Sequence, residues 1–125
     1  MFCLVMALAE SVVGSVIRVA SKAERQAARD CVAAYHEARL GELLEHVGRA
    51  LDRFRAGQLD AFEVDAVIHQ YYRAAQRLWT FCGESGAQVE AAAHLIEDMA
   101  GAGEVIDWWQ RGMSARARRA EGPDA

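Results

Sequence analysis

Hydrophobic residues recur every three or four positions through most of the chain, and the spacing is clearest between residues 40 and 82. Such spacing places apolar side chains along one stripe of an α-helix. We predict two helices here, each with a buried stripe that packs on the other. The first stripe consists of Leu40, Leu44, Val47, Leu51 and Phe54, and the second of Val64, Ile68, Tyr71, Ala75, Leu78 and Cys82.

The residues between these two helices carry the signals of a helix end followed by a helix start. Gly57 suits the left-handed position that closes a helix. Asp60 is a favourable N-cap, and Glu63, three positions later, completes a capping box. Leu59 and Val64 occupy the two positions of a hydrophobic staple. The pattern therefore predicts a long helical hairpin.

Weaker helical patterns precede the hairpin. Residues 2–20 have apolar side chains at helical spacing and predict a first helix. Ser21 and Glu24 have capping-box spacing, so a second helix starts there or the first one runs through, and both alternatives stay open. The stripe that begins at Leu40 does not extend backwards, which favours a bend or a change of packing partner near Gly41.

The pattern after the hairpin completes the predicted fold. Ser85 and Gln88 cap a further helix that Gly101 and Gly103 end, and residues 104–111 are expected to form two more helical turns. The sequence thus predicts an all-α protein, an antiparallel bundle of about four main helices built on the hairpin, with a short C-terminal helix and a disordered tail. We expect one domain over residues 1–111 and a flexible Arg-rich tail over residues 112–125.

Composition narrows the class of protein. A chain of 125 residues supports one domain, and 14 basic against 18 acidic residues give a formal charge of −4. This balance makes nucleic acid an unlikely partner. Every basic residue except Lys22 is an arginine, which together with the many alanines is typical of a GC-rich bacterial genome.

The cysteines and the opening segment bear on location. Cys3, Cys31 and Cys82 are odd in number and have no CxxC spacing, so neither a disulfide framework nor a thiolate zinc site is expected. This usage favours a cytoplasmic location. The opening apolar segment is too short to span a bilayer and lacks a basic start, so we expect no membrane association.

No motif in the sequence points to catalysis or to a cofactor, and we assign no catalytic or cofactor-binding residue. Three histidines follow an acid by one helical turn, a spacing that is common on solvated helix surfaces. Carboxylates and imidazoles at such spacing also build metal sites in bundles. The alternative is therefore a helical-bundle metal-binding protein or hydrolase that uses Glu90, His94 and Glu97 with His69 from a neighbouring helix.

Small and very large side chains suggest a binding surface on the hairpin. Gly41 and Gly48 lie seven residues apart on one line of the first hairpin helix, where another helix can approach closely. Tyr72 and Trp79 occupy the flank of the second, and rings of this size call for cover from another helix or another chain.

The C-terminal half adds further candidates. Trp108 and Trp109 are adjacent and diverge by about 100° on a helix, so we expect one to dock on the bundle and the other to be available to a partner. Arg73 and Arg77 form an outward-facing basic pair. We therefore expect a small non-enzymatic helical interaction or regulatory protein, comparable to antitoxins or accessory subunits, that forms a homodimer and binds a protein partner.

Overall fold

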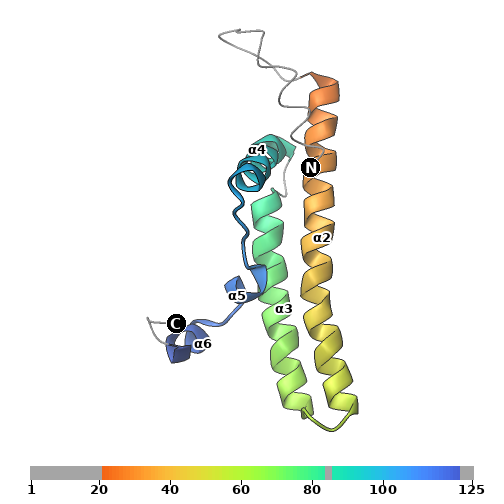
Figure 1. The fold of residues 1–125 in the computed structure, drawn as a ribbon, viewed down its shortest axis with the longest axis vertical. Helices are drawn as coiled ribbons and strands as arrows, with labels where there is room; N and C mark the ends of the chain where they lie inside the picture. The colour runs from red at the N-terminus through yellow and green to blue at the C-terminus, as the bar shows by residue number, and fades with distance from the viewer. Residues whose placement is uncertain (1–20, 84–85, 122–125) are drawn as a thin grey trace. The chain divides into compact units, whose positions relative to one another are not determined.

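The computed structural model describes residues 21–83 and 86–121, and its regular elements over these ranges are all helices (Figure 1). No strand occurs in the described ranges, so the all-α prediction is confirmed. The helix expected over residues 2–20 lies outside the described residues. The helices are α2 (Lys22–Arg55), α3 (Ala61–Cys82), α4 (Gly86–Ala102), α5 (Trp108–Arg111) and α6 (Ala115–Glu121).

The chain divides into two compact units. The first comprises Met1–Glu37 and Thr80–Ile106, and the second comprises Ala38–Trp79 and Asp107–Ala125. Helix α2 runs through without a break from Lys22 to Arg55, so it contributes to both units. The sequence left a bend or a change of partner open near Gly41. Helix α2 is continuous at Gly41. The boundary between the two compact units falls three residues earlier, where the second unit begins at Ala38.

In the second unit, two helical segments lie side by side and run in opposite directions (Figure 1). We call these segments, Ala38–Arg55 of α2 and Ala61–Trp79 of α3, the hairpin. The side chains of Leu43 and Leu78 are almost fully buried between them, at 2% and 0% exposure. Three smaller residues of the two segments are also buried: Ala50, Val64 and Ala74. Their burial is the main source of stability for this pair, because removing apolar surface from water is the dominant favourable term in folding.

The buried stripe differs from the predicted one on α2 and in the middle of α3. Leu44 and Ile68 were expected inside, but they are 50% and 43% exposed. The neighbouring Leu43 takes the core position on α2, and Ala74 replaces Ala75 in the centre of α3. Phe54 is likewise exposed, beyond the end of the stripe. On α2 the buried line is therefore rotated by about 100°, the angle between successive residues on a helix, whereas Val64, Leu78 and Cys82 of α3 are buried as predicted.

The first unit has its own small core. The rings of Tyr35 on α2 and Phe81 on α3 lie with their centroids 5.8 Å apart. Helix α4 contributes small residues and Met99 to the buried set. The buried residues of this unit are Cys31, Val32, Cys82, Ala92, Ala93 and Met99. A core of mostly small side chains lets backbones approach closely but buries little area per residue.

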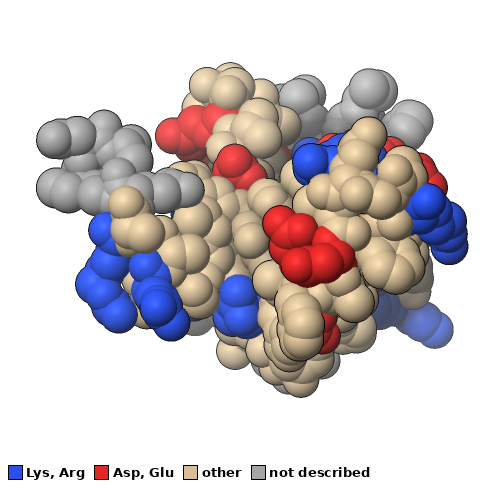
Figure 2. Space-filling view, turned by 90° about the horizontal axis from the view of Figure 1, so that it is seen from below, with Lys and Arg blue, Asp and Glu red and all other residues tan. Residues whose placement is uncertain are grey.

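Charged residues lie at the surface, and no polar or charged residue is buried in the described ranges. Figure 2 shows Lys and Arg side chains in separate groups, with Asp and Glu side chains among them. Exposed pairs within one helix, such as Arg39 with Glu42 at 2.9 Å, contribute little to stability. No helix in the described part of the chain is long and apolar enough to cross a membrane.

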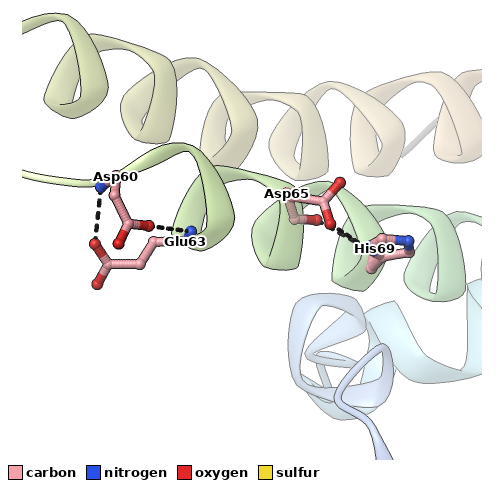
Figure 3. A network of polar contacts seen from close by, with 4 residues as sticks. All are labelled: Asp60, Glu63, Asp65 and His69. Atoms are coloured by element: carbon pink, nitrogen blue, oxygen red, sulfur yellow. Dashed lines mark hydrogen bonds and ion pairs between the residues drawn. The ribbon is translucent and has the colours of Figure 1, made fainter.

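The turn between α2 and α3 follows the sequence prediction closely. Gly57 has a φ of 78°, the left-handed conformation expected at a helix end. The backbone N–H of Glu63 donates to the Asp60 carboxylate at 2.8 Å, and the Asp60 N–H donates to the Glu63 carboxylate at 2.9 Å (Figure 3). Ser21 and Glu24 make the same reciprocal pair at the start of α2. Both predicted capping boxes are confirmed.

The C-terminal third departs from the prediction in two places. The expected helix over residues 104–111 is only α5, because residues 104–107 are not helical and Asp107 caps the start. The tail was expected to bury nothing from Gly112 onwards, yet Gly112 is buried and α6 follows it. Helix α4 does end as expected, with Gly103 at a φ of 71°. The predicted N-cap at Ser85 lies outside the described residues.

The cysteines also differ from expectation. Cys31 is disulfide-bonded, although the sequence analysis expected no disulfide framework. Cys82 is a free, buried thiol. Cysteine usage therefore no longer favours a reducing compartment over an oxidising one.

Candidate interaction surface

One face of the hairpin is packed against the segment that contains α5. Asp107 accepts a hydrogen bond from the backbone N–H of Gln110 at 3.1 Å and fixes the start of this one-turn helix. The indole of Trp109 then stacks on the imidazole of His46, with ring centroids 4.0 Å apart and planes only 2° from parallel. This stack ties α5 to α2.

Backbone contacts tie the same segment to α3. The side-chain amide of Gln70 donates to the carbonyl of Trp109 at 2.8 Å, and the Arg73 Nε donates to the carbonyl of Gly112 at 2.6 Å. Gly112 lies so close to α3 that a Cβ atom would stand 2.5 Å from the Gln70 carbonyl oxygen and 2.7 Å from Ala74. Only glycine fits this approach without a shift. We call the side formed by His46, Gln70, Arg73 and Ala74 the covered face.

Trp108 belongs to the same segment, residues 107–112, which we call the covering segment. It is 5% exposed, and the Arg111 guanidinium carbon lies 5.6 Å from the centre of its ring. The sequence analysis expected one tryptophan to dock and one to be available. The structure instead engages both, since Trp108 is buried and Trp109 stacks on His46.

The opposite side of the hairpin is found by helical geometry. Leu44 precedes His46 by two residues and Tyr72 follows Gln70 by two, so each lies about 200° around its helix from the covered face. Residues three, four and seven positions away continue the same line on each helix. We call this side the open face: Gly41, Leu44, Gly48, Ile68, Tyr72, Ala75 and Trp79.

The open face exposes a large apolar surface. The exposed fractions are 50% for Leu44, 43% for Ile68, 61% for Tyr72 and 52% for Trp79. A Cβ atom added at Gly41 or Gly48 would meet nothing within 4 Å, so the helix surface beside these rings is free of obstruction. Apolar side chains exposed on one side of a helical pair are typical of interaction sites when they form a contiguous patch.

The residues that the sequence analysis assigned to partner binding lie on different faces of the structure. Gly41, Gly48, Tyr72 and Trp79 share the open face. Arg73 is on the covered face and binds the Gly112 carbonyl, so its guanidinium is engaged within the chain. Trp108 and Trp109 belong to the segment that packs on the covered face, and Arg77 is exposed. The other large residues of the open face, Leu44 and Ile68, had been placed in the core by the sequence analysis.

His69 and His94 lie on exposed helix surfaces. His69 contacts Asp65 one turn earlier at 3.3 Å (Figure 3), and His94 contacts Glu97 at 3.8 Å. Neither pair acquires a third ligand: no group of three or more His, Cys, Asp or Glu side chains that could hold a metal occurs in the described residues. The metal alternative built on Glu90, His94, Glu97 and His69 thus lacks the cluster that it requires there.

In the described residues the surroundings shift the pKa of three side chains, and burial lowers the pKa of the first, His36. Burial lowers the pKa of His46 and the nearby Arg49 lowers it further, against the smaller opposing effects of Asp107 and Glu45. Burial raises the pKa of the Cys82 thiol to about 11. Cys82 is therefore protonated near neutral pH and is not a nucleophile.

Part of the covered face had a signal in the sequence and part had none. Asp107 and Gln110 have N-cap spacing, which marks the start of α5. No local sequence pattern connects His46 or Gln70 to the residues near position 110. Gln70 and Trp109, for example, are 39 positions apart along the chain. No protein-family model, curated protein or solved structure matches the chain.

Proposed function

We propose that this chain is a small non-enzymatic interaction protein that binds helical surfaces through the open face of its hairpin and forms a homodimer. The observation that carries the proposal is the apolar exposure of Leu44, Ile68, Tyr72 and Trp79 on one side of a two-helix unit. Half-exposed apolar side chains favour association because burying them releases ordered water.

A protein partner with an apolar helix is the second element of the proposal. An amphipathic helix that lies against two neighbouring helices is a recurrent mode of recognition. The open face presents glycines on α2 and exposed rings on α3 to such a helix. The function would then be comparable to that of antitoxins and accessory subunits, which bind and cover a surface of another protein and do not catalyse a reaction.

The proposal is tested by the mass of the protein in solution. Light scattering coupled to size exclusion should give twice the mass of one chain at micromolar concentration. Tyr72→Ser and Leu44→Ser should shift the mass towards the monomer while the helical content stays constant. Phe62→Ser is the matched control, because Phe62 is 85% exposed on the same helix but lies about 15 Å along the axis from Tyr72.

The partner is identified by comparison of the same variants. Proteins captured by the wild-type chain and by Phe62→Ser, but not by Tyr72→Ser, bind through the open face. A wild-type chain that is monomeric at every concentration, with identical capture by all three proteins, would contradict the proposal.

A further inference from the structure

The two sides of the hairpin carry opposite charge. A charged residue of the hairpin that lies three, four or seven positions from an open-face residue on the same helix shares the side of that residue. By this rule the open side carries three acids and one arginine: Glu45, Asp52, Asp65 and Arg55. The same rule applied to the covered face, with Arg73 of that face included, gives five arginines and two acids: Arg39, Arg49, Arg53, Arg73, Arg77, Glu42 and Glu63. The side that exposes apolar side chains is therefore acidic, and the opposite side is basic.

The three acids of the open side are accessible to a bound partner. We call Glu45, Asp52 and Asp65 the acidic border, and all three are exposed. Each contacts a basic side chain on its own helix, at 3.8 Å for Glu45 with Arg49, 3.5 Å for Asp52 with Arg55 and 3.3 Å for Asp65 with His69 (Figure 3). Exposed pairs of this kind contribute little, so the carboxylates remain available to a cation from another molecule.

The apolar side chains and the acids together specify the chemistry of a partner. Leu44, Ile68 and Tyr72 are about half exposed, and the apolar stripe of an amphipathic helix can cover them. The acids beside them attract basic side chains and repel acidic ones, so charge selects among helices that all carry an apolar stripe. Asp65 precedes Tyr72 by seven residues, about 10.5 Å along α3, so a helix of about three turns contacts both.

On this basis we propose that the open face binds an amphipathic helix of a partner protein whose apolar stripe is bordered by Lys or Arg. The stripe packs on Leu44, Ile68 and Tyr72, and the basic side chains pair with the acidic border. This partner chemistry rests on the proposed function, which it narrows to one class of helix. A second copy on the same face brings its own acidic border, so the basic helix should displace it.

Two synthetic peptides test the preference for charge. Both are amphipathic helices of about four turns with the same leucine stripe, which is bordered by lysine in one peptide and by glutamate in the other. Fluorescence anisotropy with the full chain should show about tenfold tighter binding of the lysine peptide at low salt. The difference should shrink at high salt, because exposed charges are screened.

A substitution on the open face tests whether the peptide binds there. Tyr72→Ser should raise the dissociation constant of the lysine peptide about tenfold, because a ring that the partner covers is lost. The Tyr72 side chain is 61% exposed, so the fold should persist, which circular dichroism checks. Phe62→Ser is again the control, and it should leave binding of the lysine peptide unchanged.

Two matched charge reversals separate the acidic border from the net charge of the chain. Asp65→Lys changes the border, and Glu42→Lys is the control on the covered side. Both acids are exposed, and each contacts a basic side chain on its own helix, His69 at 3.3 Å and Arg39 at 2.9 Å. Asp65→Lys should raise the dissociation constant of the lysine peptide about fivefold, and Glu42→Lys less than about twofold. Equal losses in the two variants would show that binding follows net charge and would overturn the proposal.

The two proposals fail in different ways. If both peptides bind equally and Tyr72→Ser weakens both, the charge preference is wrong and the proposed function stands. If neither peptide binds and the chain is a dimer that Tyr72→Ser dissociates, a second copy is the occupant of the open face and only the proposed function stands. If Tyr72→Ser changes neither peptide binding nor the mass in solution, the open face is not the interface and both proposals are overturned.

Discussion

The two faces of the hairpin differ in a way that hydrophobicity alone does not anticipate. The covered face presents His46, Gln70 and Arg73, and the chain packs its own C-terminal segment there. The open face presents apolar side chains that stay about half exposed. Polar side chains attract the segment because they donate hydrogen bonds to its backbone carbonyls, which a purely apolar face cannot do. The comparison shows that the more apolar of the two faces is the one that stays half exposed.

The largest loss of stability is expected from substitutions in the buried core of the hairpin. Leu78→Ala removes a fully buried side chain and should lower the free energy of unfolding by about 2–5 kcal/mol. Leu44→Ala, on the open face, should cost less than about 1 kcal/mol, because half of the side chain is already in water. Chemical denaturation at low protein concentration measures both. Equal losses would show that Leu44 is a core residue after all.

The packing on the covered face should be disturbed by a single methyl group at Gly112, the residue of the covering segment that lies closest to α3. Gly112→Ala places a Cβ against the Gln70 carbonyl and Ala74, so the covering segment must shift, at an expected cost of about 1–3 kcal/mol. Loss of the Trp109–His46 stack should change the tryptophan fluorescence. Gly101→Ala is the control and should be neutral or slightly stabilising. An unchanged melting temperature for Gly112→Ala would contradict the close approach.

The turn that joins the two helices is expected to have an intermediate effect. Asp60→Ala removes the N-cap of α3 and should cost about 1 kcal/mol in the free energy of unfolding. Asp65→Ala, five residues later on the same helix, loses only an exposed contact with His69 and should change stability by less than about 0.5 kcal/mol. Thermal melts of the two variants separate the cap from a general loss of negative charge.

The smallest expected effect is a pH dependence of the free energy of unfolding, which arises from His46 on the covered face. The pKa of His46 is lowered in the folded protein, so the unfolded chain binds a proton more readily. The free energy of unfolding should therefore fall as the pH drops below about 6.5. His46→Phe keeps a ring against Trp109 and should reduce this pH dependence. His36, whose pKa burial also lowers, should account for what remains. A pH profile that does not change in His46→Phe would show that the stack does not sense protonation.

Local signals in the sequence were sufficient for the ends of the helices. The Asp60–Glu63 and Ser21–Glu24 boxes and the glycine at position 57 act within four residues, so the sequence alone determined them. The all-α class follows from the same spacing of apolar residues. These features need no distant partner, which is why they could be predicted.

Tertiary structure decided which side of α2 is buried and which residues in the middle of α3 stay exposed. Leu43 and Leu44 are identical side chains at adjacent positions, and Ala74 and Ala75 are as well, so hydrophobic pattern could not choose between them. The choice depends on how α2 and α3 face each other and on the segment from Asp107 to Gly112, whose contacts with Gln70 and Arg73 span 39 residues. Contacts at such separation depend on the packed chain as a whole, and they turned two predicted core residues, Leu44 and Ile68, into the open face.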